Sequence, residues 1–210
     1  MIENVRGILD AIFHDYRRYI AGRLGALGYA TAWKLMNASD FGVPQLRPRV
    51  VFIALKKDLA ERFSWPSPLD TRPPTVAATL YDLMAAKEWV GADAWAKRAG
   101  EIAPTIVGGS HKHGGPDLGP TRARKAWAAL DVDGRGIAND APPRDFVGMP
   151  RLTVRMVARI QGFPDDWQFA GTKTQIYRQV GNAFPPPFAH AMAQRLKACL
   201  VSPRRERRAG

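Results

Sequence analysis

The stretch PQLRPRVVFIAL, residues 44–55, decides the fold of this chain. Its last seven residues, RVVFIAL (49–55), form an apolar run rich in β-branched side chains, which is typical of a strand buried on both faces of a sheet. Upstream, YATAWKLMNASDFGVPQ (29–45) predicts a short strand followed by a turn. A helix followed by strands with short links predicts an α/β fold whose parallel strands are covered by helices.

The helix expected before these strands lies near the N-terminus. Its apolar residues recur at helical spacing: Ile8, Leu9, Ile12, Phe13, Tyr16, Ile20 and Leu24. Gly25 and Gly28 are expected to end it. Because a parallel sheet is not built from two strands, this segment is interpreted as the closing portion of a larger doubly wound domain.

Two more helices are predicted nearer the C-terminus. LTVRMVARIQGF (152–163) predicts a helix that Thr153 is well placed to cap. Prolines at 185–187 open the second, in which Phe188, Met192, Leu196 and Leu200 mark one face. Between the two halves, from about residue 66 to 148, proline and glycine are dense and apolar runs are short, which predicts a small irregular lobe.

Composition narrows the class of protein. A hydrophobic fraction of 46% and a charged fraction of 24% are those of a soluble globular protein. No apolar run approaches the roughly 20 residues that span a bilayer, and no secretory leader is evident, so a cytoplasmic location is expected. The single cysteine, Cys199, excludes an internal disulfide framework and a cysteine-cluster metal site.

The charge favours a polyanionic partner. Lys and Arg total 31 against 19 for Asp and Glu, a formal charge of +12, and release of counterions from phosphates drives such proteins onto nucleic acids. A basic protein that merely stays soluble is the alternative. The arginine-rich tail SPRRERRAG is expected to be disordered, with a non-specific role only.

Two short stretches are chemically unusual. Gln45, Arg47 and Arg49 are spaced by two, so in an extended chain they project on one face, where two arginines can form a donor fork for a carboxylate, phosphate or base oxygen. A solvated strand entrance is the alternative. The corner Gly181-Asn182 suits close approach of the backbone to a ligand, but equally a plain turn.

A third stretch, TIVGGSHKHGGPDLGPTRARKAW (105–127), combines glycines with basic side chains. Lys112, Arg122, Arg124 and Lys125 could follow a DNA groove and contact phosphates and base edges. His111 and His113 suggest a metal site instead, but no cysteine or carboxylate stands at suitable spacing, so no metal is expected.

Taken in order, four blocks closely resemble the C-terminal half of the DNA cytosine-5 methyltransferases. They are ENV (3–5), NASDFGVPQLRPRVVFIAL (37–55), RLTVRMVARIQGFPDDW (151–167) and TQIYRQVGNAFPPP (174–187). The resemblance covers residue 2 to about residue 196, with a variable recognition region between the second and third blocks. GGSHKHGGPDLGPTRARKAW (108–127) also resembles the recognition region of one bacterial branch.

This resemblance implies a fold and a division of the chain. Residues 1–65 would be the closing part of a Rossmann-like methyltransferase domain that uses S-adenosylmethionine, and 66–148 would be a small irregular target-recognition lobe. Residues 149–200 would form a hinge helix and a return to the catalytic domain, followed by the basic tail 201–210. The partner implied is double-stranded DNA, and the reaction is methyl transfer to carbon 5 of a flipped cytosine, within restriction-modification.

The resemblance also implies roles for residues. Glu3 would face the flipped cytosine and protonate ring nitrogen 3, because attack on ring position 6 is poor without that proton. Arg47 and Arg49 would help to hold the base and the catalytic groups. Asn182 and Ala183 match the block that closes over S-adenosylmethionine.

Two parts of the family pattern have no match in this sequence. Neither the glycine-rich turn that binds S-adenosylmethionine nor the Pro-Cys loop that supplies the nucleophile is found, and Cys199 lies in the wrong place, so it is interpreted as a small buried hydrophobe. The chain alone is therefore expected to be inactive, with only part of the cofactor site. It would be one subunit of a split methyltransferase, with the N-terminal half on a separate chain, or else a deliberately shortened chain or a truncated gene product. The alternatives are a non-catalytic DNA-binding protein derived from such an enzyme and, less favoured, a relative acting on tRNA.

Overall fold

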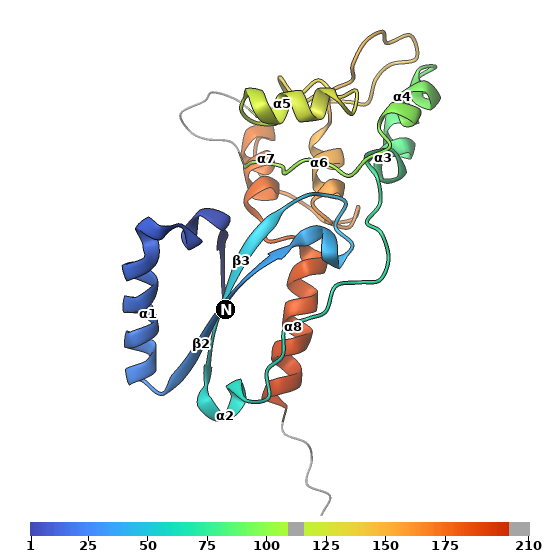
Figure 1. Cartoon of the computed structure of the whole chain (residues 1–210). Coiled ribbons are helices and arrows are strands. Elements are labelled where there is room, and N and C mark those ends of the chain that lie inside the picture. Colours follow the sequence, from blue (N-terminus) through green and yellow to red (C-terminus); the bar gives the residue numbers. More distant parts are fainter. Residues whose placement is uncertain (109–115, 202–210) are drawn as a thin grey trace, which may run out of the picture. The chain divides into compact units, whose positions relative to one another are not determined.

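The structure is a computed structural model of the chain, and it describes residues 1–108 and 116–201 (Figure 1). The chain divides into two compact units. The first contains Met1–Met36, Pro48–Pro68 and the residues from Ala189 onward, and the second contains Asn37–Arg47 and Leu69–Phe188. Residues 69–148 of the predicted recognition lobe thus lie in the second unit, together with helices that follow residue 148.

The first unit is built on a three-stranded sheet of order β1-β3-β2. Its strands are β1 (Ile2–Val5), β2 (Tyr29–Asn37) and β3 (Pro48–Lys56). The middle strand β3 is the predicted buried strand, since Val50 and Val51 are fully buried. The prediction of a buried strand at residues 49–55 is therefore confirmed.

The predicted parallel pairing is wrong for β1 and β3. They run antiparallel, with Ile2 opposite Phe52 and Val5 opposite Arg49. An apolar run indicates burial on both faces but carries no information about strand direction, which the connections set. The chain enters β3 from β2 through only the ten residues Ala38–Arg47, which include the 3-10 helix η3, Ala38–Phe41, and a left-handed Gly42.

The first helix begins later than predicted. Helix α1 (His14–Ala26) follows two 3-10 turns, η1 (Arg6–Leu9) and η2 (Ala11–Phe13). The extended backbone at Asp10 separates the two turns. Gly25 lies inside α1, and the left-handed Gly28 follows its end, so only the second of the two predicted glycine stops is confirmed.

Two other helices contribute to the first unit. They are the short α2, Lys57–Ala60, and all but the first three residues of α8, Pro186–Leu200. The predicted face of α8 is correct for Phe188 and Met192, which are fully buried, whereas Leu200 is 57% exposed. Cys199 takes its place in the interior, as its interpretation as a small buried hydrophobe required.

The second unit holds the larger core of the molecule. Its helices are α3 (Val76–Ala85), α4 (Ala92–Arg98), α5 (Thr121–Ala128), α6 (Val154–Ile160) and α7 (Lys173–Asn182). Helix α3 packs against α4 and α6, and α6 packs against α7 (Figure 1). Trp95 and Trp127 are fully buried in one continuous apolar cluster. The region with short apolar runs therefore folds around a complete core.

The N-terminus of α6 shows how local sequence sets a helix start. The hydroxyl of Thr153 accepts a hydrogen bond from the Met156 N–H at 3.2 Å, as predicted. Thr172 caps α7 in the same way, with Gln175 completing a capping box. Within residues 1–108 and 116–201, no helix is both long and apolar enough to cross a membrane.

Candidate functional site

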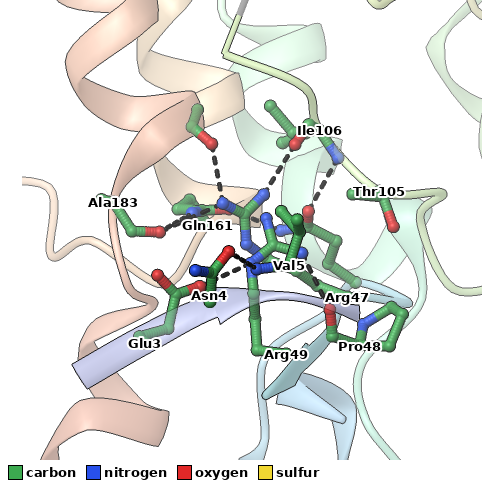
Figure 2. A network of polar contacts seen from close by, with 12 residues as sticks. Glu3, Asn4, Val5, Arg47, Pro48, Arg49, Thr105, Ile106, Gln161 and Ala183 are labelled. Atoms are coloured by element: carbon green, nitrogen blue, oxygen red, sulfur yellow. Dashed lines mark hydrogen bonds and ion pairs between the residues drawn. The ribbon is translucent and has the colours of Figure 1, made fainter. Parts of the chain in front are cut away.

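In the first unit, β1 and β3 bring Glu3 and Arg49 together. The Arg49 Nε atom lies 2.6 Å from the Glu3 Oε1 atom, and the two side chains are 11% and 22% exposed (Figure 2). Arg49 also donates through Nη1 to the Pro48 carbonyl oxygen at 2.8 Å. Burial lowers the pKa of the Arg49 guanidinium, and the adjacent Glu3 opposes that shift. The result is a partly covered carboxylate whose position is fixed by a charged donor.

Arg47 belongs to the second unit, where it is almost completely buried at 1% exposure. Its Nη1 donates to the Ile106 carbonyl at 2.6 Å. Its Nη2 donates to the carbonyls of Gly181 at 2.7 Å and Ala183 at 3.2 Å (Figure 2). A single guanidinium thus ties together three segments that are distant in the sequence.

Two buried glutamines complete this arrangement. Gln45 accepts from the Ile106 N–H and donates to Gln161 Oε1, both at 2.7 Å. Gln161 in turn donates to the Ala183 carbonyl at 2.7 Å. The bonds close a ring through Gln45, Gln161, Ala183, Arg47 and Ile106, which we call the buried ring. Because a buried polar group without its partner is costly, each member holds its neighbours in place.

The buried ring lies beside a close approach of two backbones. A β-carbon added to Gly181 would fall 2.5 Å from the Cα atom of Gly108. One added to Gly108 would fall 2.0 Å from the Asn182 Oδ1 atom. The Gly181-Asn182 corner is therefore not a plain turn, since its glycine permits a protein segment, Val107-Gly108, to pack on the end of α7.

These contacts settle one alternative left open by the sequence. Gln45, Arg47 and Arg49 are 0%, 1% and 9% exposed, so they do not form a solvated strand entrance. Arg49 pairs with Glu3, and Arg47 holds protein carbonyls, so the two arginines do not share one acceptor. Gln161 was missed by sequence reasoning. Its signal was an amide at the C-cap position of α6, just before the left-handed Gly162.

The basic residues predicted to contact DNA lie on α5 where the structure describes them. Arg122 and Lys125 are exposed, and Arg124 is half-buried. Lys112, with His111 and His113, lies outside the described residues. Among the residues that are described, no group of three or more His, Cys, Asp or Glu side chains is arranged to hold a metal ion.

Comparison with known proteins gives matches over nearly the whole chain. A model of the C-5 cytosine-specific DNA methylase family matches residues 1–198. The chain is 56% identical over 204 residues to the Type II methyltransferase M.NaeI of Lentzea aerocolonigenes, covering 95% of this chain and 49% of that protein. It is 49% identical over 203 residues to M.NgoMIV of Neisseria gonorrhoeae, covering 95% of this chain and 64% of that protein. The chain thus spans 49% and 64% of the lengths of these two relatives.

Solved structures share the fold. A putative DNA modification methyltransferase encoded in an Escherichia coli prophage matches 94% of this chain and 68% of its own, with a TM-score of 0.58 and 23% identity. The Dnmt2 methyltransferase of Schizosaccharomyces pombe matches 96% of this chain and 67% of its own, with a TM-score of 0.55 and 17% identity.

Proposed function

The chain belongs to the C-5 cytosine-specific DNA methylase family, and we propose that it supplies target recognition and part of the active site for methylation of cytosine in double-stranded DNA. The reaction would transfer a methyl group from S-adenosylmethionine to carbon 5 of a cytosine flipped out of a specific site. The observation that carries the proposal is the Glu3–Arg49 pair at 2.6 Å, in the block that resembles the family's proton-donating element.

Glu3 would act on ring nitrogen 3 of the flipped cytosine. Nucleophilic attack on ring position 6 places negative charge on the ring, and a proton or strong hydrogen bond at nitrogen 3 stabilises that charge. Arg49 contributes by fixing the carboxylate, because its Nε donates to Glu3 while its Nη1 is anchored on the Pro48 carbonyl. A proton donor must be held in place to act within hydrogen-bond reach of a base.

Asn182 and Ala183 would contribute to the cofactor site. The Ala183 N–H donates to the Val180 carbonyl, and its carbonyl oxygen accepts from Arg47 and Gln161. At this corner the amide of Asn182 is exposed, and we assign it to contact with the cofactor. One amide fits part of S-adenosylmethionine but cannot hold all of its polar groups, so the rest of the site would come from the family's N-terminal half, including its glycine-rich turn.

Exposed apolar residues of the first unit support the proposal that a partner covers part of its surface. Helix α1 has no buried residue, and Ile12 before it is 83% exposed. Ile2 and Val5 on the edge strand β1 are 58% and 56% exposed, and Leu27 at the end of α1 is 64% exposed. Exposed apolar side chains on an edge strand and along a helix are typical of an interface. We assign it to the N-terminal half of the methyltransferase domain, carried on a separate chain or on a longer form of this one.

Labelled S-adenosylmethionine tests the proposal directly. The pure chain should transfer no label to duplex DNA, because its sequence has no Pro-Cys loop. Addition of the N-terminal half of a family member should restore incorporation into cytosine. Glu3→Gln in the restored enzyme should lower the rate about 100-fold or more, as expected for loss of a proton donor. Glu61→Gln, an exposed glutamate of the same unit, is the matched control.

Each outcome of this assay has a clear reading. Incorporation by the pure chain would contradict the need for a second half. A Glu3→Gln enzyme with normal turnover would remove Glu3 from the proton-donating role. Specific DNA binding without methylation by the restored enzyme would favour the non-catalytic DNA-binding alternative. The setting proposed for the enzyme is DNA-associated, in the cytoplasm, within a restriction-modification system, as the Type II names of the relatives suggest.

A further inference from the structure

A buried carboxylate in the second unit holds two exposed arginines. Asp133 Oδ1 accepts from the Nε of Arg135 at 2.8 Å, and its Oδ2 accepts from the Nη2 of Arg135 at 3.2 Å and the Nε of Arg151 at 2.9 Å. The Asp133 side chain is 9% exposed, whereas those of Arg135 and Arg151 are 70% and 48% exposed. The carboxylate thus fixes two guanidinium groups on side chains that remain exposed to solvent.

The anchor itself is rigid. Asp133 Oδ1 also accepts from the Arg135 N–H at 3.0 Å, which locks the turn that carries that arginine. The Arg151 guanidinium lies beside Gly136, where an added β-carbon would be 3.4 Å from Nη1, about van der Waals contact. The neighbouring arginines hold the pKa of the Asp133 carboxyl well below its usual value, so the anchor stays charged at neutral pH.

Two hollows make this cluster continuous with α5. One, of about 250 Å³, is lined by Arg124 and Lys125 of α5 together with Arg135 and Met149. The other, of about 600 Å³, is lined by Arg135, Arg151 and several residues between Pro142 and Pro150, among them Val147 and Met149. Asp133, Arg135 and Met149 line both. The arginine pair therefore shares a surface with the basic helix already proposed to contact DNA.

An apolar tip stands beside the arginines. Val147 is 91% exposed and Met149 is 41% exposed, with a left-handed Gly148 between them. The base of this tip is anchored, since Trp89 Nε1 donates to the Phe146 carbonyl at 2.8 Å and the two rings pack edge to face at 5.8 Å. An exposed apolar tip on an anchored base is suited to contact with a partner.

The acidic groups that line these two hollows, Asp133 and Asp140, are both paired with basic side chains. Asp133 is shared by two arginines, and Asp140, which lines the larger hollow, lies 3.4 Å from Lys87 Nζ. Arg124, Lys125 and the arginine pair then leave the lining positive. Glu88 and Asp145 stand near the same segment, and Glu88 is paired with Arg144 at 2.8 Å.

We propose that Arg135 and Arg151 read guanine bases in the DNA target, with Val147 against a base or sugar in the same groove. The inference rests on the proposed function, because it needs duplex DNA as substrate. An arginine recognises guanine through two parallel hydrogen bonds to O6 and N7, which requires a fixed planar donor. Attraction to phosphate needs only net charge, and a shared carboxylate reduces that charge. The Asp133 anchor therefore favours orientation over attraction, as base reading demands.

Selection from a random duplex pool tests this assignment. The full chain and its variants are incubated with the pool at several salt concentrations, and the bound duplexes are sequenced. Arg135→Ala and Arg151→Ala should each lose preference at a guanine position, with affinity for the selected site falling on the order of 10- to 100-fold. Arg98→Ala is the control, because Arg98 is an exposed arginine held on one carboxylate, that of Asp131, at 2.7 Å.

Asp133→Asn separates the two physical explanations. It keeps both arginines and adds one positive charge, so a role in phosphate attraction alone predicts equal or tighter binding with the motif unchanged. A role in orienting the arginines predicts a weaker motif without loss of non-specific affinity. Arg135→Lys should likewise keep the charge and lose the guanine preference. Circular dichroism and thermal unfolding verify that each variant is folded, and a folded Arg135→Lys carries the test if Asp133→Asn unfolds.

The inference and the proposed function fail differently. If the restored enzyme methylates DNA and all arginine variants keep the wild-type motif, the base-reading role is wrong while the function stands. If the variants lose only the salt dependence of binding, with the motif intact, the arginines contact phosphate and the proposal is overturned. If the wild-type chain selects no motif and the restored enzyme transfers no methyl group, both fail.

Discussion

In the second unit, Leu80, Trp95 and Trp127 are fully buried, whereas α1 in the first unit buries none of its residues. Both regions contain many apolar side chains, but only the second closes a core around them. The first unit buries β3 and leaves apolar groups of β1 and α1 exposed. The pattern of apolar residues therefore identifies helices and strands. Whether a core is closed depends on which other segments pack against those elements.

The largest expected effect comes from one truncation made in each region. Leu80→Ala in α3 should lower the free energy of unfolding by about 2–5 kcal/mol, because it leaves a cavity in a closed core. Leu27→Ala, at a 64% exposed leucine, should change it by less than about 0.5 kcal/mol. Urea unfolding followed by fluorescence measures both. Equal losses would mean that the first unit is as tightly packed as the second.

The buried ring should rank next. Arg47→Met removes the donors to the carbonyls of Ile106, Gly181 and Ala183 and should cost about 1–3 kcal/mol. Arg18→Met, at an exposed position on α1, is the matched control and should be close to neutral. The Ile106 N–H donates a hydrogen bond to the Gln45 side chain, so hydrogen exchange at this N–H reports on the buried ring itself. Unchanged exchange in Arg47→Met would show that the ring holds without the arginine.

Acid should weaken the second unit through Asp133. Its arginines lower the pKa of the Asp133 carboxyl in the folded state. The carboxylate therefore contributes fully to the free energy of unfolding above the pKa of an unfolded aspartate, about 4. This contribution is lost as the pH falls through the lower pKa of the folded state. Asp133→Asn should remove roughly 1–2 kcal/mol of that acid dependence between about pH 4 and pH 2. Asp58→Asn, an exposed carboxylate in the first unit, provides the comparison. Identical acid profiles for wild type and Asp133→Asn would contradict the depressed pKa.

The smallest effect is expected at Cys199. Cys199→Ala should cost about 1 kcal/mol or less, since the thiol is small and buried at 1% exposure on α8. Methyl transfer by the restored enzyme should be unchanged. The thiol should also react slowly with an alkylating reagent in the folded chain and rapidly in urea. Loss of methyl transfer in a folded Cys199→Ala chain would make this cysteine more than a packing residue.

Local signals predicted the elements well. The run at 49–55 is the buried strand β3, Thr153 caps α6, and the prolines before Phe188 open α8. Each of these depends on residues close together in the sequence, and therefore on chemistry that a short window contains. The family followed from four such blocks in order, and the model match over residues 1–198 confirms it.

Long-range features could not be predicted in the same way. The antiparallel pairing of β1 with β3 and the buried ring both depend on which distant segments meet, as with Gln45 and Gln161. The core of the second unit was missed because its apolar residues are dispersed among prolines and glycines and gather only in three dimensions. The roles of Glu3, Arg47, Arg49, Asn182 and Ala183 stay predictions, because a side chain's position does not by itself show its chemistry.

The close approach of Gly108 and Gly181 limits how this chain can change in evolution. A β-carbon on Gly181 would meet the main chain of Gly108, and one on Gly108 would meet the side-chain amide of Asn182. A side chain at either position would therefore displace the other segment. The two glycines should accordingly be kept or lost together in relatives of this chain, although they lie far apart in the sequence.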